Sequence, residues 1–230
     1  MKERIGIIGA MESEVATLIP AMEDRAEQTI GIVVYHTGKL DGRDVVVARS
    51  GVGKVNAALT AAEMIRTFGA TAIINTGVAG ALEESLNPED AVIATDLVQH
   101  DYDTTPFDPP GCVSGIGQVK IPVDPAISAA AAKAARELGM RVLEGTVASG
   151  DQFISDGEKK KRIRDTFGAF ACEMEGAAIA QACYLLGARC GVIRTISDRA
   201  DGEADVDFPT FAAHAAALNA KIVRKILPTV

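Results

Sequence analysis

Three acidic residues follow strands that the sequence predicts, at positions where they could act on one ligand. Glu14 lies just after the first predicted strand, Glu175 lies at the start of a helix of small residues, and Asp198 ends the segment Arg194–Asp198. Because ligands of open α/β sheets bind beyond the carboxyl ends of the strands, these carboxylates could share a site. Two carboxylates in different environments are what glycosidic bond cleavage requires, one as a protonated acid and one as a base for water.

Each of these residues also has a structural interpretation when it is considered alone. Acidic side chains favour the N-terminal end of a helix, which is the preferred interpretation of Glu12 and an equal alternative for Glu14. Asp198 could be a turn or capping residue. Glu175 precedes the apolar run AAIAQA, where a buried carboxylate needs partners such as ribose hydroxyls. No nucleophile triad or metal set accompanies these residues, so their combination favours acid–base chemistry.

The glycine-rich segments do not match the motifs that bind nucleotide phosphates. Ser50–Lys54 has the wrong spacing for a phosphate loop, and Val55 stands where Ser or Thr would bind magnesium. Asn75–Gly80 is expected to follow a strand, where its glycines either let a ligand approach the backbone or form a turn. The segment before Glu14 lacks the GxGxxG pattern, which argues against a dinucleotide site.

Composition excludes several classes of protein. The chain has 230 residues, 31 acidic against 23 basic, and a net charge of −8, which argues against a nonspecific nucleic-acid binder. Its 48% of hydrophobic residues excludes disorder, and a single domain over residues 1–230 is expected. Scattered cysteines and histidines predict no disulfide, metal or cofactor site. No segment has the length of a signal peptide or membrane span, so we expect a cytoplasmic protein without a membrane partner.

Strands alternate with helices along the chain, which predicts a three-layer α/β/α sandwich around a mixed, twisted sheet. Strands are expected at 4–9, 31–37, 43–49, 71–76, 91–98, 141–149 and 190–196, the second and third of them as a hairpin. Helices are expected from Glu12 onward and at 53–69, 125–138, 156–167, 175–186 and 208–226. The irregular segment 103–118 is too long for a simple connection and is expected to be functional or part of an interface.

Six segments in order carry a resemblance that covers almost the whole chain: GIIGAMESE, SGVGKVNAA, INTGVAGAL, SGDQFI, EMEGAAIAQ and IRTISD. They resemble the methylthioadenosine/S-adenosylhomocysteine nucleosidases of the nucleoside phosphorylase superfamily. The resemblance implies a homodimer that acts on a small adenine nucleoside. It also implies hydrolysis of the N9–C1′ bond, with adenine and a thioribose derivative as products.

The resemblance also implies roles for the polar candidates. Glu14 matches the carboxylate that activates water, and Asp198 matches the acid that protonates N7 of adenine. Glu175, with Met174 beside it, matches the group that holds the ribose hydroxyls. Arg194 and Ser197 match positions that support the water and the acid.

The apolar candidates match the binding sites for the base and for the 5′ tail. Phe153 resembles the ring that stacks on adenine, and Ile154 the residue whose backbone reads the base edge. The tail pocket corresponds to Met11, Val52 and Phe208, completed by the partner subunit's Phe107. Val78 replaces a Ser that several relatives carry.

Three alternatives remain open at the level of sequence. A phosphorylase of the same superfamily needs an anion site, and Glu14 beside the nucleophile would repel phosphate. An aminodeoxyfutalosine nucleosidase would use the same apparatus with another tail, and a non-catalytic nucleoside binder would not need all three carboxylates. For the hydrolase we predict inversion at C1′, with Glu14 and Asp198 farther apart than the ~5–5.5 Å of retaining glycosidases.

Overall fold

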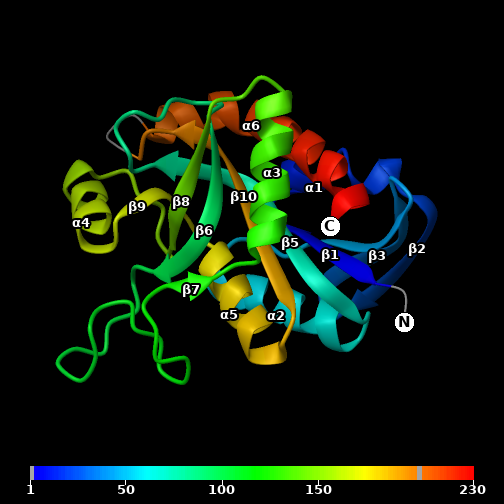
Figure 1. Ribbon diagram of the computed structural model, residues 1–230, viewed down its shortest axis with the longest axis horizontal. Coiled ribbons are helices and arrows are strands. Elements are labelled where there is room, and N and C mark those ends of the chain that lie inside the picture. The colour runs from blue at the N-terminus through cyan, green and yellow to red at the C-terminus, as the bar shows by residue number, and fades with distance from the viewer. Residues whose placement is uncertain (1–2, 201–203) are drawn as a thin grey trace.

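The computed structural model describes residues 3–200 and 204–230, and the strands of this part of the chain form one mixed sheet (Figure 1). The sheet runs in the order β10-β6-β8-β9-β5-β1-β4-β3-β2, with β7 beside β6. The strands are β1 (Arg4–Gly9), β2 (Glu23–Ile30), β3 (Val33–Leu40), β4 (Arg43–Arg49), β5 (Ala70–Ala81), β6 (Ala91–Gln99), β7 (Ile121–Pro122), β8 (Val142–Ser149), β9 (Ala169–Glu173) and β10 (Arg189–Asp198).

Part of the sheet closes on itself. Strand β10 pairs in parallel with β5 and antiparallel with β6. In addition, β6 pairs with β8, β8 pairs with β9, and β9 pairs with β5. Five strands therefore form a ring, and β1, β4, β3 and β2 extend from it as an open sheet. Because β1, β5 and β10 are mutually parallel, their carboxyl ends lie at the same edge.

Helices cover both faces of the sheet, which confirms the predicted three-layer architecture. Helices α2 and α5 pack together on one face, and α1, α3 and α6 cover the other, while α4 packs against β8 and β9 (Figure 1). The helices are α1 (Glu12–Val15), α2 (Lys54–Arg66), α3 (Pro125–Glu137), α4 (Gly157–Phe167), α5 (Gly176–Leu186) and α6 (Ala204–Ile226), with short 3-10 turns at Ile19–Ala21 and Leu227–Thr229. No helix of the described residues is long and apolar enough to cross a membrane.

Strand β5 is longer than the sequence predicts, because it continues through Gly77 and Gly80 instead of turning there. A Cβ atom on Gly77 would lie 2.5 Å from Glu14 Oε1, and one on Gly80 would lie 2.8 Å from Asp198 Oδ1. The two glycines therefore allow carboxylates of the protein itself to approach the strand closely. Of the two expected roles, the turn was wrong, and close approach by a ligand stays a prediction.

Three strands were not predicted, namely β2, the two-residue β7 and β9, and the first helix is shorter than expected. Strand β2 is exposed along nearly its whole length and pairs only with β3, so its sequence lacks an apolar alternation. Strand β9 is buried between β8 and β5 but has only 5 residues. Helix α1 ends after 4 residues, and a 3-10 turn follows it.

Helix α2 buries a different face from the one that its larger apolar residues define. Val55 and Leu59 are exposed, whereas the buried residues are Ala57, Thr60, Ala61 and Met64. Ala57 and Ala61 allow α2 to approach the sheet and α5 closely, and Val55 and Leu59 face outward.

Candidate active site

A cavity of about 440 Å³ lies at the carboxyl ends of β1, β5, β9 and β10. Ten of the sequence-predicted site residues line it: Met11, Glu14, Val52, Val78, Phe153, Met174, Glu175, Ser197, Asp198 and Phe208. A larger cavity of about 800 Å³ near Arg4 and Gly187 contains none of them. The structure therefore gathers residues that are far apart in sequence at the edge where ligands of parallel strands bind.

Glu14 is held at the first turn of α1 by backbone donors from two segments. Its Oε2 accepts the N–H groups of Ala10 at 2.6 Å and Met11 at 2.9 Å, and its Oε1 accepts that of Val78 at 3.1 Å. Burial raises the pKa of Glu14 above its ordinary value, although Arg194 and these N–H groups act in the opposite direction. A raised pKa makes an ionised carboxylate a stronger proton acceptor.

Glu175 lies at the N-cap of α5 and receives a hydrogen bond from a distant glycine. The N–H of Gly53, at the N-cap of α2, donates to Glu175 Oε1 at 2.9 Å. Burial, followed by repulsion from Glu173, raises the pKa of Glu175 to about 7, against the attraction of Arg194. Glu175 can therefore donate or accept hydrogen bonds with hydroxyl groups of a ligand in the cavity.

A lysine supports the N-terminus of α2 from behind the cavity. Lys54 Nζ lies 2.6 Å from Asp101 Oδ1 and 3.1 Å from Gln99 Oε1. The Lys54 N–H donates to Asp151 Oδ1 at 2.8 Å, and the Asp151 N–H donates to Asp101 Oδ2 at 2.8 Å. These bonds connect α2 to the loop that carries Phe153.

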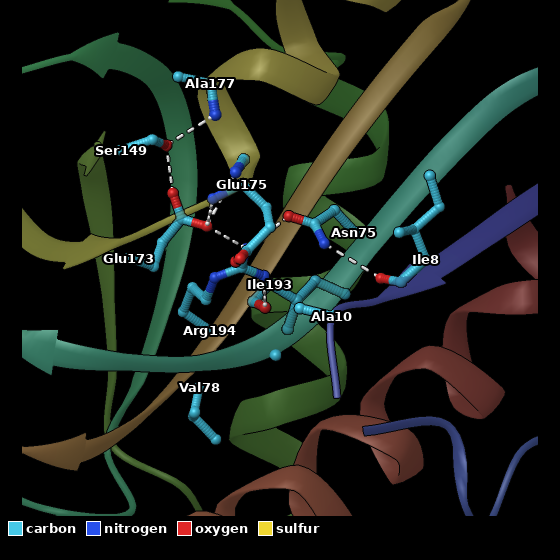
Figure 2. A network of polar contacts seen from close by, with 12 residues as sticks. Ile8, Ala10, Asn75, Val78, Ser149, Glu173, Glu175, Ala177, Ile193 and Arg194 are labelled. Carbon is cyan, nitrogen blue, oxygen red and sulfur yellow. Dashed lines mark hydrogen bonds and ion pairs between the residues drawn. The ribbon is translucent and has the colours of Figure 1, made fainter. Parts of the chain in front are cut away.

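Arg194 lies beneath the cavity instead of lining it. Its side chain is 1% exposed and contacts Glu173 Oε2 and Asn75 Oδ1, while its Nη1 donates to the Ile193 carbonyl at 3.1 Å (Figure 2). Glu173 and Glu175, followed by Glu14, also attract this guanidinium, which raises the pKa of Arg194 although burial opposes the shift. Among the described residues, Arg194 is the one cation that attracts all three of Glu14, Glu173 and Glu175.

Glu173 is the site residue that sequence reasoning missed. Its carboxylate lines the cavity and contacts both Arg194 and the Ser149 hydroxyl. Burial works against its ionisation, but Arg194 and Ser149 outweigh burial and lower its pKa. The segment Cys172–Gly176 did contain a signal, since it holds two acidic residues, but without β9 in the prediction the direction of Glu173 could not be inferred.

Asp198 ends β10 at an irregularity in the strand. The register between β10 and β5 shifts between Ile196 and Asp198, so Ser197 is an additional residue there. Ser197 Oγ lies 2.8 Å from Asp198 Oδ2 and 3.4 Å from the Ala79 carbonyl, and the Ala200 N–H donates to Asp198 Oδ1 at 2.8 Å. Bulges near active sites re-aim side chains, and here both Ser197 and Asp198 face the cavity.

The remaining wall of the cavity is apolar. Val78 packs with Met11, Phe208 and two alanines of α6. The ring of Phe153, which is half-exposed, meets Phe208 edge-on with centroids 5.8 Å apart. Val78 cannot donate the side-chain hydrogen bond that a Ser would supply.

Besides Arg194, two predicted residues do not line the cavity. Ile154 is buried in a separate cluster with Leu82, Val98 and Phe167. Phe107 is 89% exposed on the segment between β6 and β7, which projects away from the sheet at the lower left of Figure 1. A backbone role for Ile154 and a role for the partner subunit's Phe107 stay predictions.

No cluster of three or more His, Cys, Asp or Glu side chains suited to a metal ion occurs in residues 3–200 and 204–230. The cavity lining that the structure describes also contains no Lys, Arg or His. The ionisable and hydroxyl side chains of the described lining are four carboxylates, the Ser197 hydroxyl and the Cys172 thiol.

Comparisons with known proteins show the family of the chain. The Phosphorylase superfamily model matches residues 4–228. A 5′-methylthioadenosine/S-adenosylhomocysteine nucleosidase of Shewanella oneidensis is 42% identical over 97% of this chain and 96% of its own length. An aminodeoxyfutalosine nucleosidase of Campylobacter jejuni is 39% identical over 97% of both chains.

A solved structure gives the same result. The 5′-methylthioadenosine/S-adenosylhomocysteine nucleosidase of Neisseria meningitidis in complex with methylthio-immucillin-A has a TM-score of 0.96 and 40% identity, over 99% of this chain and 100% of that one. The predicted fold and the predicted family are thereby confirmed. The chain belongs to the phosphorylase superfamily, as its six ordered segments indicated.

Proposed function

We propose that the protein is a purine nucleosidase that hydrolyses the N-glycosidic bond of 5′-methylthioadenosine and S-adenosylhomocysteine. The observation that carries the proposal is the placement of Glu14, Glu175 and Asp198 around one cavity with an apolar wall. The likeness to nucleosidases over nearly the full length of the chain supports it. The products are adenine and the corresponding thioribose.

Asp198 acts on the leaving group. As the C1′–N9 bond breaks, its electron pair moves to the base, and Asp198 donates a proton to N7 of adenine. Ser197 can hydrogen-bond to Asp198 both before and after this transfer, because its hydroxyl lies near both Asp198 Oδ2 and the Ala79 carbonyl. It accepts from the protonated acid while donating to Ala79, and it donates to Asp198 once the carboxylate has formed.

Glu14 acts on the attacking water. Loss of the base leaves an oxocarbenium-like sugar, and Glu14 removes a proton from the water that attacks C1′ on the opposite face. Positioned acid–base groups of this kind typically contribute about 10²–10⁴-fold to a rate. The product is expected to have inverted configuration at C1′, and an initial β-configured sugar would contradict this step.

The other residues bind the substrate. Glu175 accepts hydrogen bonds from the ribose hydroxyls beside Met174, and Phe153 stacks on adenine. The tail lies against Met11, Val52, Val78 and Phe208, whose side chains suit an alkylthio group.

The absence of Lys, Arg and His from the described lining supports hydrolysis over phosphorolysis, because phosphate needs a cation or several donors. An aminodeoxyfutalosine nucleosidase remains the second candidate, since a relative of that name is 39% identical over 97% of this chain. The test is an adenine-release assay in phosphate-free buffer with methylthioadenosine, S-adenosylhomocysteine and aminodeoxyfutalosine. Release that requires phosphate would overturn the proposal, and turnover of aminodeoxyfutalosine alone would favour the second candidate.

We also infer that the single domain formed by residues 1–230 works as a homodimer. Large apolar side chains are exposed on neighbouring parts of the surface, with Val55 68% and Leu59 66% exposed on α2 and Leu185 59% exposed on α5. A groove of about 720 Å³ runs between these two helices. An apolar patch of this kind is typical of an interface, and a second copy could bring the partner subunit's Phe107 to the tail pocket.

The thiols fit a reducing compartment. All four cysteines are free, and Cys172, Cys183 and Cys190 are buried. We therefore infer a cytoplasmic location, which fractionation of the source cells would test.

A further inference from the structure

One buried carboxylate of the cavity, Glu173, has no role in the steps above. It lies at the end of β9, two residues before Glu175, and its side chain is 2% exposed. An ionised group at this depth requires several strong partners. What it binds therefore indicates what it does.

The two oxygens of Glu173 organise the start of α5. Oε2 accepts the N–H of Glu175 at 3.0 Å and that of Gly176 at 2.8 Å, and it also contacts Arg194. Oε1 contacts the Ser149 hydroxyl, whose oxygen accepts the Ala177 N–H at 2.7 Å (Figure 2). The first donors of a helix have no partner within the helix, and here Glu173 and Ser149 supply three of them with acceptors.

Three carboxylates of this cluster compete for Arg194. Glu14, Glu173 and Glu175 all attract its guanidinium, but among the described residues only Glu173 contacts it as an ion pair. The Glu175 carboxylate receives one hydrogen bond from the described part of the chain, that of Gly53. Because Arg194 pairs with Glu173, the Glu175 carboxylate retains acceptor positions that can bind the substrate.

We propose that Glu173 is a positioning residue that holds Arg194 away from Glu175 and fixes the N-terminus of α5, so that Glu175 faces the ribose hydroxyls. This inference rests on the proposed nucleosidase function for the identity of the ligand. It does not rest on that function for the arrangement of the cluster.

Replacement of Glu173 by Gln should release Arg194 to pair with Glu175. The variant should lose about 10²-fold in kcat/KM, mainly through a higher KM, because the ribose carboxylate is occupied. In a Glu175→Gln background the same change should cost less than threefold, since the two residues act as one unit. Equal losses in both backgrounds would overturn the inference.

A second measurement requires no activity. In ligand-free protein labelled with ¹³C-carboxyl glutamate, Glu175 should titrate near pH 7, the region to which burial and Glu173 raise its pKa. In Glu173→Gln the midpoint should fall by at least one pH unit, because a repelling charge is lost and Arg194 becomes available, while Glu14 contributes repulsion in both proteins. An unchanged midpoint would overturn the inference.

Two further variants complete the test. Glu173→Asp keeps the charge and should restore most of the Glu175 titration even if its shorter side chain lowers kcat/KM. Glu144→Gln removes one side of an exposed Glu–Arg pair, with Arg136 at 2.6 Å, and should change neither readout. If wild-type protein releases no adenine, the proposed function fails, while the titration still decides the role of Glu173.

Discussion

Gly53 donates its backbone N–H to Glu175 Oε1 at 2.9 Å, although the two residues are 122 positions apart in sequence. The bond joins the N-terminus of α2 to that of α5 at the proposed ribose carboxylate. Gly53 has φ 103°, a conformation that favours glycine. The position of α2 is therefore part of the active-site geometry.

The Lys54–Asp101 pair should stabilise this arrangement more than an exposed pair does. Lys54→Met leaves Asp101, whose side chain is 15% exposed, without its cation. We expect a loss of about 1–3 kcal/mol in the free energy of unfolding, between the values for exposed and fully buried pairs. We also expect a decrease of about tenfold in kcat/KM, which corresponds to ~1.4 kcal/mol at the Gly53–Glu175 contact.

A matched control exists on α4. Lys161 and Asp165 also lie 2.6 Å apart, but their side chains are 69% and 48% exposed. Lys161→Met should cost at most about 1 kcal/mol in urea unfolding and leave kinetics unchanged. Equal effects of the two variants would show that the Lys54 pair has no special role.

Glu14→Gln should abolish most of the turnover while preserving binding. The amide keeps the size of the side chain but cannot accept the proton of water, so we expect kcat to fall about 10²–10⁴-fold. Single-turnover adenine release gives the rate, and calorimetry with a non-hydrolysable adenosine analogue gives the affinity. A decrease below tenfold would assign the base to another group.

Gly77→Ala should inactivate the protein through steric contact alone. The added Cβ would lie 2.5 Å from Glu14 Oε1 and 3.4 Å from Arg194 Nη1. We expect about 1–3 kcal/mol of destabilisation and displacement of Glu14. Gly157→Ala is the control, because nothing lies within 4 Å of its added Cβ. Normal kinetics in Gly77→Ala would contradict the close packing of Glu14 on β5.

The ionisation of Glu175 should make stability depend on pH. Its pKa is about 7 in the folded protein against the ordinary glutamate value of 4.5, so the folded state binds more protons between these values. The resulting stabilisation is fully present below about pH 4.5 and is lost as pH rises through 7, with a slope of at most ~1.4 kcal/mol per pH unit. Urea unfolding of wild type and Glu175→Gln from pH 5 to 8 should show this difference. Parallel curves would contradict it.

Leu59→Glu should dissociate the proposed homodimer, because it places a charge in the apolar surface of α2 and α5. Sedimentation equilibrium should give a monomer for this variant and a dimer for wild type. Ile32→Glu is the control, since Ile32 is 95% exposed in the turn between β2 and β3. A monomeric wild-type protein would refute the assembly directly.

The sequence by itself determined the fold class and most of the site. Alternating strands and helices are local periodic features, and Glu14 and Asp198 follow predicted strands at the edge where ligands bind. The family resemblance lies in contiguous motifs, which is why it could be recognised from the chain alone. Ten predicted residues accordingly line one cavity.

The tertiary structure decided which groups contact one another. Strand β2 has no apolar alternation, because it is an exposed edge, and β5 extends through glycines whose purpose is visible only with Glu14 and Asp198 in place. Which of the three carboxylates forms an ion pair with Arg194 likewise depends on distances between β9, β10 and α5. Local sequence carries the propensity of a segment, but burial, charge pairing and close approach depend on neighbours that only folding brings together.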